Sequence, residues 1–482
     1  MKGILAAVTL GVIAATVLGA DKPLAWPQFR GPNGTGVADD QKPPIEFGPE
    51  KNVLWKVTTP AGLSSPIVAG DLVVFTAFDG DKKKLYTVAY QRADGKEAWR
   101  REAPAKKIEA YFKAEGSPAA STPATDGERI VSYFGSCGLI CYDLAGKELW
   151  KYELPMAVTA ADFGSGTSPI LADGLVVLVR DVRSDSKILA VDVVTGSLKW
   201  EKSRKSLSSY GTPTVWDAPG GKQVVAAGHG RLIAYDLKSG EEKWSVTGMP
   251  SGPCTSPIAA DGAVYFAGWS PGGPDDKEFQ MPGFDVIHKQ AGAKDEGSIT
   301  RAEAQKSMLK DFFDAVDENK DGKVSRDEWD AVLKFMAEGR NSAFAVKADG
   351  AGDVTKSHVL WTKTKGLPYV PTGIVYRGQF LIVKDGGLVT AYDAKTGKEL
   401  YVQEREVAAG RYYASPVAAN GHIYVTALED GTVTVLKGGS PKPEVVVKNP
   451  KLGEKVAATP AIAGDTIYIR TAGHLYAFGV KK

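Results

Sequence analysis

The chain has 482 residues, and its 59 Lys and Arg residues against 57 Asp and Glu residues give a formal net charge of +2. This near balance excludes a protein that holds nucleic acid mainly by electrostatics. Three cysteines are too few for a disulfide framework, and their odd number favours unpaired, partly buried thiols. They are Cys137, Cys141 and Cys254.

Residues 1–20 have the composition of a secretory signal peptide. One Lys at position 2 precedes an uncharged run rich in Ala, Val, Leu and Ile, which ends in the small residues Gly19 and Ala20. We expect cleavage near residue 20 and an exported protein, periplasmic or extracellular. No later window is long and apolar enough to span a bilayer, so we expect no transmembrane segment.

Most of the remaining chain consists of copies of one unit. Each copy begins with Ser or Thr followed in most cases by Pro, and continues with two apolar runs separated by a Gly turn. Its second half resembles residues 230–244, GRLIAYDLKSGEEKW, where an apolar strand passes through a Ser-Gly turn to a strand anchored by Trp244. The residues that follow the Ser or Thr markers are Pro66, Pro123, Pro169, Pro213, Pro257, Gly373, Pro416 and Pro460.

These eight units predict an all-β fold, an eight-bladed β-propeller with four-stranded antiparallel blades. The markers lie 43 to 57 residues apart, with one step of 116 residues, and a period of ~40 to 50 residues with four strands per unit is typical of propellers. The last unit supplies only three strands before the sequence ends. Trp55 occupies the place of a fourth-strand Trp, so we expect the N-terminal strand to close the last blade and cover its edge.

The long step marks an insertion in the fifth blade. Strands are predicted at 263–268 and 342–348, so the insertion joins the second and third strands and opens on the face that carries the loops between blades. The Pro- and Gly-rich segment that follows the signal peptide is expected to wrap the outside, with Trp26 and Phe29 as hydrophobic pegs. The predicted divisions are a signal peptide (1–20), a wrapping segment (21–50), the first propeller part with the closing strand (51–270), the insertion (271–341) and the second propeller part (342–482).

Residues 317–328 of the insertion, DENKDGKVSRDE, match the twelve-residue calcium loop of an EF-hand. Gly322 at position 6 permits the sharp turn, Ser325 at position 9 can hold a bridging water, and Val324 at position 8 can pair the loop with a neighbour. The predicted metal ligands are Asp317, Asn319, Asp321, the backbone carbonyl of Lys323, and Glu328. Apolar residues at helical spacing flank the loop, and we interpret them as a helix-pair core: Met308, Leu309, Phe312, Phe313, Val316, Trp329, Val332, Leu333 and Met336.

A second, degenerate loop precedes the first. Residues 292–303, GAKDEGSITRAE, keep Gly at position 6, Ile299 at position 8 and Glu at position 12. Gly292, Lys294 and Glu296 stand where short acidic ligands are needed, so we expect a structural partner that binds no metal. The expected load is one calcium ion.

Aromatic residues recur in the predicted loops between blades. An aromatic rim with a cation suits a glycan, a quinone or a peptide, although the same rings could simply plug the channel. The five histidines show no metal-ligand spacing, and Ser, His and Asp form no recognisable triad. The rim residues are Tyr111, Phe112, Phe163, Tyr210, Tyr369, Arg411, Tyr412 and Tyr413.

Repeats of the form A-x-D-x-x-(S/T)-G-K-x-x-W resemble the blades of propellers of the pyrroloquinoline-quinone (PQQ) type, over roughly residues 50–482. That family includes quinoprotein dehydrogenases and the non-catalytic BamB scaffold of outer-membrane assembly, so the resemblance leaves function open. The adjacent Cys pair that lies beneath PQQ in such dehydrogenases has no counterpart here. The sequence therefore favours a monomeric, non-catalytic module that binds a protein or glycan ligand on its loop face, with a PQQ-dependent oxidoreductase as the alternative.

Overall fold

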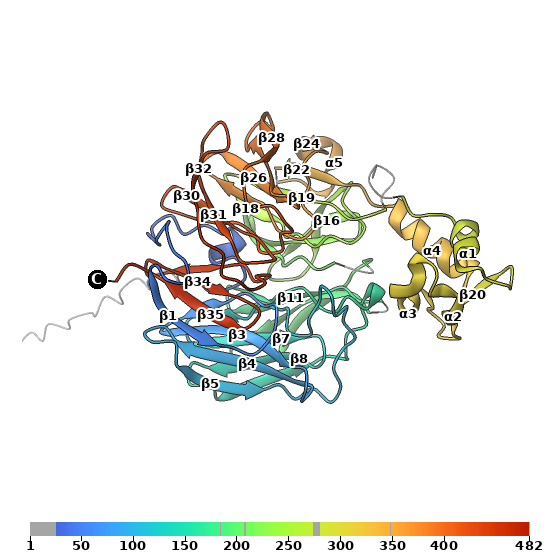
Figure 1. Cartoon of the computed structure of the whole chain (residues 1–482), viewed down its shortest axis with the longest axis horizontal. Helices are drawn as coiled ribbons and strands as arrows, with labels where there is room; N and C mark the ends of the chain where they lie inside the picture. The colour runs from blue at the N-terminus through green and yellow to red at the C-terminus, as the bar shows by residue number, and fades with distance from the viewer. Residues whose placement is uncertain (1–25, 184, 207–208, 273–279, 348, 482) are drawn as a thin grey trace, which may run out of the picture.

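The computed structural model describes residues 26–183, 185–206, 209–272, 280–347 and 349–481, and the predicted signal peptide lies outside them. Within these residues the predicted eight-bladed propeller is confirmed, with eight blades of four antiparallel strands each, the last of which is completed by an N-terminal strand (Figure 1). The three free cysteines are also as predicted. No helix in the described part of the chain is long and apolar enough to cross a membrane.

Each blade runs from an inner to an outer strand. Blades 1 to 4 comprise β2 (Ile67–Ala69), β3 (Leu72–Asp79), β4 (Lys84–Gln91) and β5 (Glu97–Glu102); β6 (Ala124–Thr125), β7 (Arg129–Phe134), β8 (Gly138–Asp143) and β9 (Glu148–Glu153); β10 (Ile170–Ala172), β11 (Leu175–Arg180), β12 (Lys187–Asp192) and β13 (Leu198–Ser203); and β14 (Thr214–Ala218), β15 (Gly221–Gly228), β16 (Arg231–Asp236) and β17 (Glu242–Thr247).

Blades 5 to 8 comprise β18 (Ile258–Ala260), β19 (Ala263–Gly268), β22 (Ser342–Val346) and β24 (Val359–Lys363); β25 (Ile374–Tyr376), β26 (Gln379–Lys384), β27 (Leu388–Asp393) and β28 (Glu399–Arg405); β29 (Val417–Ala419), β30 (His422–Thr426), β31 (Val433–Lys437) and β32 (Val445–Lys448); and β33 (Ala461–Ala463), β34 (Thr466–Arg470), β35 (His474–Phe478) and β1 (Val53–Thr58). A short extra strand, β23 (Gly352–Asp353), adds in parallel to β17, and α5 (Thr355–His358) follows it. Two 3-10 turns, η1 (Pro32–Gly34) and η2 (Ala160–Asp162), lie in loops.

The Ser or Thr that opens each repeat forms a closed ring of hydrogen bonds around the propeller. In every blade its backbone N–H donates to the hydroxyl oxygen of the equivalent residue in the next blade, at 2.9–3.1 Å. All eight residues are buried, so each bond satisfies an amide that water does not reach. The ring residues are Ser65, Thr122, Ser168, Thr212, Ser256, Thr372, Ser415 and Thr459.

The Trp and Gly of the repeat join neighbouring blades at the periphery. Trp200 of β13 donates its indole N–H to the Leu237 carbonyl of blade 4 at 3.0 Å and packs on Gly240, whose φ is +71°. A Cβ at Gly240 would lie 2.4 Å from the indole, so the turn requires glycine. The same contact joins Trp55, Trp99, Trp150 and Trp361 to Gly95, Gly146, Gly196 and Gly397.

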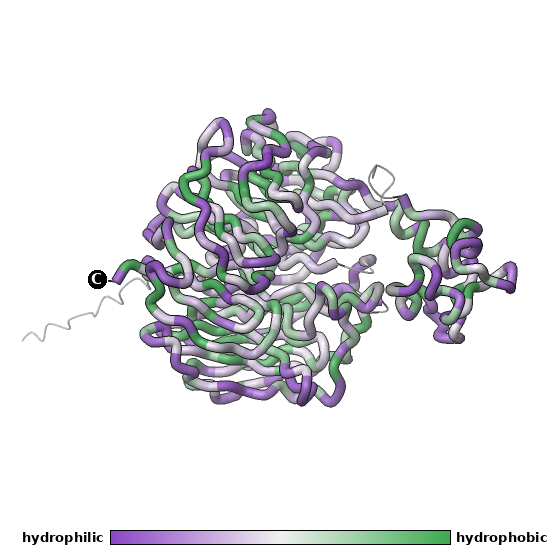
Figure 2. Tube along the Cα trace, in the orientation of Figure 1, coloured by the Kyte–Doolittle hydropathy of each residue, from purple (hydrophilic) through white to green (hydrophobic). Residues whose placement is uncertain are grey.

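The N-terminal strand closes the propeller as predicted. β1 pairs antiparallel with β35, with Trp55 opposite Ala477, and the Trp55 indole N–H then donates to the Arg92 carbonyl of blade 1 at 2.8 Å. The first and last parts of the chain therefore share blade 8. Figure 2 shows the hydrophobic segments stacked inside the sheets, with hydrophilic segments towards the periphery.

Residues 26–37 do not wrap the outside, and this expectation is corrected. Arg30 is fully buried and donates to the carbonyls of Thr372, Gly373 and Pro416 in blades 6 and 7. Asn33 exchanges hydrogen bonds with Val215 on the inner strand of blade 4. Contacts with blade 4 on one side and blades 6 and 7 on the other place this segment at the propeller axis. There its guanidinium and amide groups donate to carbonyls that would otherwise be buried without donors.

The two aromatic residues of this segment differ. Trp26 is fully buried beside β2, where its carbonyl accepts from Val68 N–H at 2.9 Å, whereas Phe29 is only half-buried. Farther along, Phe47 packs against Tyr424 and Phe478, so the later part of the segment covers blades 7 and 8.

The insertion between β19 and β22 is a small helical subdomain with its own core. It contains α1 (Phe284–Ala291), β20 (Ser298–Thr300), α2 (Arg301–Ala304), η3 (Met308–Asp311), α3 (Phe313–Val316), β21 (Lys323–Ser325) and α4 (Arg326–Ala337). Its apolar stripes form a core as predicted, with Leu309, Phe313 and Trp329 buried together. Two stripe members differ, because Phe312 is exposed and Met336 is directed to the propeller.

Candidate functional site

The 317–328 loop is held closed by its own backbone amides. The Asp317 carboxylate, only 3% exposed, accepts from Asp321 N–H at 3.1 Å and Gly322 N–H at 3.0 Å. Gly322 has a φ of +84°, which is the left-handed conformation that the motif predicts at position 6. The Asp321 carboxylate accepts from Lys323 N–H at 2.9 Å. The loop therefore folds its carboxylates inward.

Glu328 links the two ends of this loop. One carboxylate oxygen accepts from the amides of Glu318 and Asn319, and the other accepts from the amide and hydroxyl of Ser325. Burial acts to raise the pKa of Glu328, but these donors outweigh it and the pKa is lowered. Glu328 is therefore an anion over the whole neutral pH range.

The oxygens of the loop suit a hard cation, but they do not converge on one point. An oxygen that accepts one N–H, as each oxygen of Asp317 does, keeps a lone pair for a cation. Within the described residues, no group of three His, Cys, Asp or Glu side chains is assembled as a metal site. Glu328 would have to leave some of its four donors to ligate calcium from position 12.

The degenerate loop pairs with the 317–328 loop through a two-stranded sheet. Ile299 of β20 lies opposite Val324 of β21, and both residues are buried. This is the register that position 8 of the two loops predicts. Glu303 accepts from Thr300, in a capping box at the start of α2, and from Lys294 N–H. The Glu303 carboxylate therefore links the start of α2 to the degenerate loop by hydrogen bonds.

The insertion is seated on the loop face of the propeller at two places (Figure 1). At the first, α3 packs against η2, and the exposed Phe312 ring stacks on Phe112 with 6.4 Å between centroids. At the second, Phe335 of α4 stacks on His229 with 4.2 Å between centroids, and Glu338 lies 3.0 Å from His229 Nε2. The loop face is here the surface formed by the connections between blades and by the insertion.

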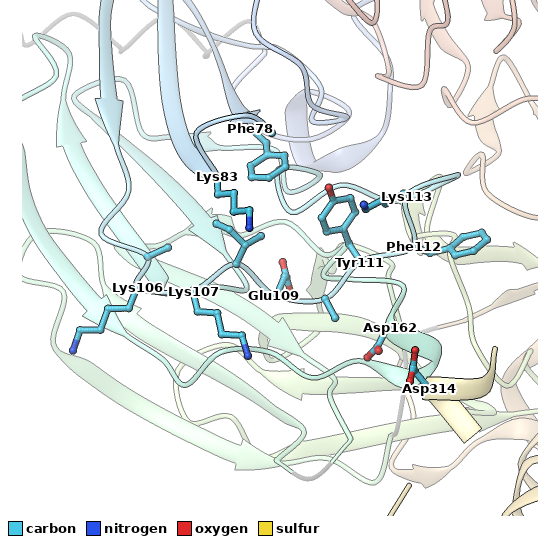
Figure 3. Close-up of a pocket in the computed structure, with 14 residues that line it drawn as sticks. Phe78, Lys83, Lys106, Lys107, Glu109, Tyr111, Phe112, Lys113, Asp162 and Asp314 are labelled. Atoms are coloured by element: carbon cyan, nitrogen blue, oxygen red, sulfur yellow. The ribbon is translucent and has the colours of Figure 1, made fainter. Parts of the chain in front are cut away.

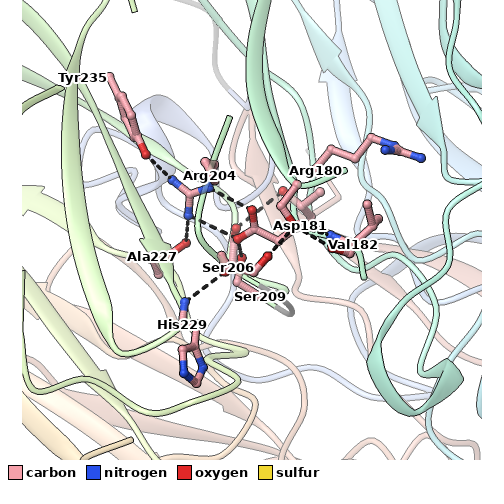
Figure 4. Close-up of polar contacts among 12 residues, drawn as sticks. Arg180, Asp181, Val182, Arg204, Ser206, Ser209, Ala227, His229 and Tyr235 are labelled. Carbon is pink, nitrogen blue, oxygen red and sulfur yellow. Dashed lines mark hydrogen bonds and ion pairs between the residues drawn. The ribbon is translucent and has the colours of Figure 1, made fainter. Parts of the chain in front are cut away.

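A buried ion pair supports the second seat (Figure 4). Arg204 and Asp181 have fully buried side chains and form a bidentate pair, with distances of 2.8 and 3.2 Å. Arg204 also donates to Tyr235, and Ser209 donates to Asp181, so the charges are well satisfied. The same loop holds His229 in place, because Ser206 Oγ accepts from His229 N–H at 2.9 Å. Neither Arg204 nor Asp181 shows any repeat or spacing that would have identified it in the sequence.

The predicted aromatic rim is partly assembled. Phe112, Phe163 and Tyr210 form a chain of edge-to-face contacts, with centroid distances of 5.7 and 6.2 Å. Tyr369 makes an edge contact with Trp269 at 5.6 Å instead of joining this chain. Tyr111 packs edge-on against Phe78 at 5.9 Å.

Tyr412 and Arg411 have different surroundings from the rest of the rim. Tyr412 is buried and donates to the Ala408 carbonyl, so it belongs to the core of the blade. Arg411 lies 3.0 Å from Glu429 and 3.6 Å from Glu115, and its guanidinium lies over the Tyr413 ring. The cation of the rim is therefore already compensated by two carboxylates.

Cys254 and Tyr369 are weak acids that lie near each other and near the Glu115 carboxylate. Burial and the Glu115 carboxylate raise the pKa of Cys254 to about 12. Burial also raises the pKa of Tyr369, with further contributions from Cys254 and Glu115. These groups stay neutral at physiological pH, so Cys254 is not activated as a nucleophile.

Sequence reasoning missed a cavity of about 680 Å³ beside the first seat (Figure 3). It is lined by the loop that joins blades 1 and 2, by the turn after β3, and by Asp314 of the insertion. Glu109 lies in its wall and is only 2% exposed. Burial raises the pKa of Glu109 to about 7. The stretch AKKIEAYFK contains no motif that would mark Glu109 as functional. Glu109 is unusual only because it is buried, and burial cannot be read from its local sequence.

The blade geometry, the hydroxyl ring and the Trp-on-Gly contacts define a propeller of the PQQ type. A family model described as outer membrane protein assembly factor BamB matches residues 84–270 and 314–482, and the chain belongs to that family. The residues between the two matched parts all belong to the insertion between β19 and β22. No curated protein matches the chain significantly.

Solved structures share the fold at low identity. BamB from Moraxella catarrhalis is 13% identical with a TM-score of 0.54, covering 89% of this chain and 99% of its own. A europium-containing methanol dehydrogenase is 11% identical with a TM-score of 0.53, covering 95% and 99%. Quinohemoprotein alcohol dehydrogenase from Comamonas testosteroni is 12% identical with a TM-score of 0.52, covering 97% and 82%. At these identities the likeness concerns the fold alone.

Proposed function

We propose that this protein is an exported, calcium-binding propeller that acts as a non-catalytic binding or scaffold module. The observation that carries the proposal is the seating of the insertion on the loop face through Phe312 and Phe335. A subdomain that bridges two sides of this face is suited to shape a ligand surface. Half-buried rings beside it, such as Tyr210 and Tyr413, offer apolar contact area with polar edges. The ligand is a protein or a glycan, and the module is a monomer.

One calcium ion binds in the 317–328 loop. Asp317, Asn319 and Asp321 supply side-chain oxygens, Lys323 supplies its carbonyl, and Glu328 closes the site. The ion would neutralise the three carboxylates and so relieve their mutual repulsion in the closed loop. Because α4 begins directly after β21, a shift of Glu328 towards the ion would move the helix that carries Phe335.

Calcium calorimetry with a matched pair of substitutions tests this site. Glu328→Gln should abolish binding, whereas Glu318→Gln, at the exposed second position of the same loop, should leave the stoichiometry at one ion. We expect a dissociation constant in the range of extracellular modules, ~0.1 to 1 mM. Equal binding by both variants would contradict the assignment.

Hydrogen exchange then separates the insertion from the propeller. Calcium should slow exchange in residues 300–340 and leave the blades unchanged, because the hydroxyl ring and the Trp contacts hold the blades independently. Equal protection of every blade would contradict a modular insertion.

The second candidate function is a PQQ-dependent oxidoreductase, which the shared fold with two dehydrogenases favours. The residues around Arg411 fit this cofactor poorly. PQQ carries three carboxylates, and Arg411, the cation of the rim, is already paired with Glu115 and Glu429. A micromolar or tighter dissociation constant for PQQ, with dye-linked alcohol oxidation, would reverse the ranking.

A further inference from the structure

The cavity between the propeller and the insertion carries features of a ligand site. Its volume of about 680 Å³ lies within the range of small-molecule sites. Its walls combine aromatic rings, those of Phe78 and Tyr111, with charged side chains (Figure 3). Asp314 of the insertion reaches its edge, so the seat at Phe312 sets the shape of the opening.

Four lysines line this cavity. None of them makes an ion pair with another residue in the part of the chain that the structure describes. Of the three lining carboxylates, Asp314 is neutralised by Arg301, which leaves Glu109 and Asp162 against four cations. The cavity therefore has a net positive charge and favours an anion. The lysines are Lys83, Lys106, Lys107 and Lys113.

The second observation is Glu109, which is nearly fully buried. Ser165 Oγ donates to its Oε2 at 2.8 Å, while Oε1 has no hydrogen-bond partner in the described residues. The fold makes room for this carboxyl group, because a Cβ at Gly135 would lie 2.2 Å from Oε2. Leaving a buried acceptor without a donor carries a cost in stability. The presence of this carboxylate is explained if a bound ligand donates a hydrogen bond to Oε1 of Glu109.

The three features restrict the ligand. The lysines require negative charge, the unpartnered oxygen of Glu109 requires a hydroxyl donor, and the rings of Phe78 and Tyr111 suit the C–H face of a sugar. A phosphate or an acidic peptide brings charge without such hydroxyls, and a neutral sugar brings hydroxyls without charge. We infer that this cavity binds an acidic saccharide, a short glycan that carries uronic acids, with its charge at the lysines and a hydroxyl at Glu109.

This inference rests on the proposal that the loop face binds ligands, and it names the ligand class. Calorimetry on the full chain without its signal peptide tests it with three probes: trigalacturonate, neutral cellotriose and the peptide triglutamate. We expect trigalacturonate to bind at least tenfold more tightly than either other probe, and its affinity to fall as salt rises. Equal or tighter binding of triglutamate or cellotriose, or no binding of trigalacturonate, would overturn the inference.

Substitutions locate the site. Lys83→Ala with Lys107→Ala should weaken trigalacturonate binding at least tenfold, whereas Lys238→Ala with Lys395→Ala, on exposed outer turns of blades 4 and 6, should leave it unchanged. Glu109→Gln should weaken binding several-fold while the protein becomes no less stable. If the Lys83 and Lys107 pair has no effect, the site is elsewhere. Calcium titration of the same samples keeps the tests distinct, because a chain that binds calcium but no saccharide refutes this inference alone.

Discussion

The Trp-on-Gly contact between blades can be measured with a matched pair of glycine substitutions. Gly240 and Gly174 both have positive φ, +71° and +77°. A Cβ at Gly240 would meet Cε3 of Trp200 at 2.4 Å, whereas a Cβ at Gly174 would have no atom within 4 Å. Gly240→Ala and Gly174→Ala therefore share the same backbone strain, and only the first collides with an indole.

The size of the difference follows from these contacts. The left-handed conformation costs alanine roughly 1–2 kcal/mol at either site. At Gly240, overpacking against Trp200 adds ~1 to 3 kcal/mol. Displacement of the indole also endangers its N–H bond to Leu237, which contributes about 1 kcal/mol. We therefore expect Gly240→Ala to lower the free energy of unfolding by ~2 to 4 kcal/mol more than Gly174→Ala does.

Urea unfolding followed by tryptophan fluorescence measures both variants. Gly240→Ala should unfold at a clearly lower urea concentration, and adding Trp200→Leu should recover part of the loss, because the smaller side chain relieves the collision. Equal midpoints for the two glycine variants would refute the idea that this contact holds neighbouring blades together.

Three further predictions test the ring, the buried carboxyl and the closure. Thr212→Val should cost ~1 to 3 kcal/mol of stability by thermal unfolding, because the buried Ser168 N–H loses its acceptor, while Thr212→Ser keeps the hydroxyl and should cost less; equal losses would contradict the ring's role. The pKa of Glu109 is raised from 4.5 to about 7 in the folded state. Its contribution to stability is therefore complete below pH 4.5 and is lost as the pH rises to 7, by about 3 kcal/mol. Glu109→Gln should accordingly be more stable than the natural chain at pH 8 but not at pH 4.5, and identical pH profiles of unfolding would contradict the burial argument. Deleting residues 21–60 should remove β1, expose the edge of β35 and cause aggregation in light scattering; a monomer with an unchanged melting temperature would disprove closure by this strand.

The blades, their number and their closure are all predictable from the amino-acid sequence. Each rests on a short pattern whose physical cause is local or repeated: a hydroxyl before an inner strand, a glycine in a positive-φ turn, and a Trp one blade earlier. Because the hydroxyl ring joins every blade to the next and the Trp-on-Gly contact recurs at five of these junctions, one decoded unit predicts the others. The position of Trp55 in that register sufficed to predict the shared last blade. The pairing of Ile299 with Val324 was predictable for the same reason, since both loops follow one template.

The irregular parts of the chain lie where contacts between distant segments place them. The sequence predicts that Arg30 lies in an outer wrapping segment, because nothing in its neighbourhood reveals the carbonyls of Thr372 and Gly373, more than 300 residues away in sequence. Phe312 has the helical spacing of a core residue, yet it lies at the seat on Phe112. Glu109 differs from other glutamates of the chain because it is buried, and its burial depends on the residues that pack around it. Contacts between distant, unrepeated segments leave no periodic pattern, so three-dimensional packing alone places these residues and the cavity that they surround.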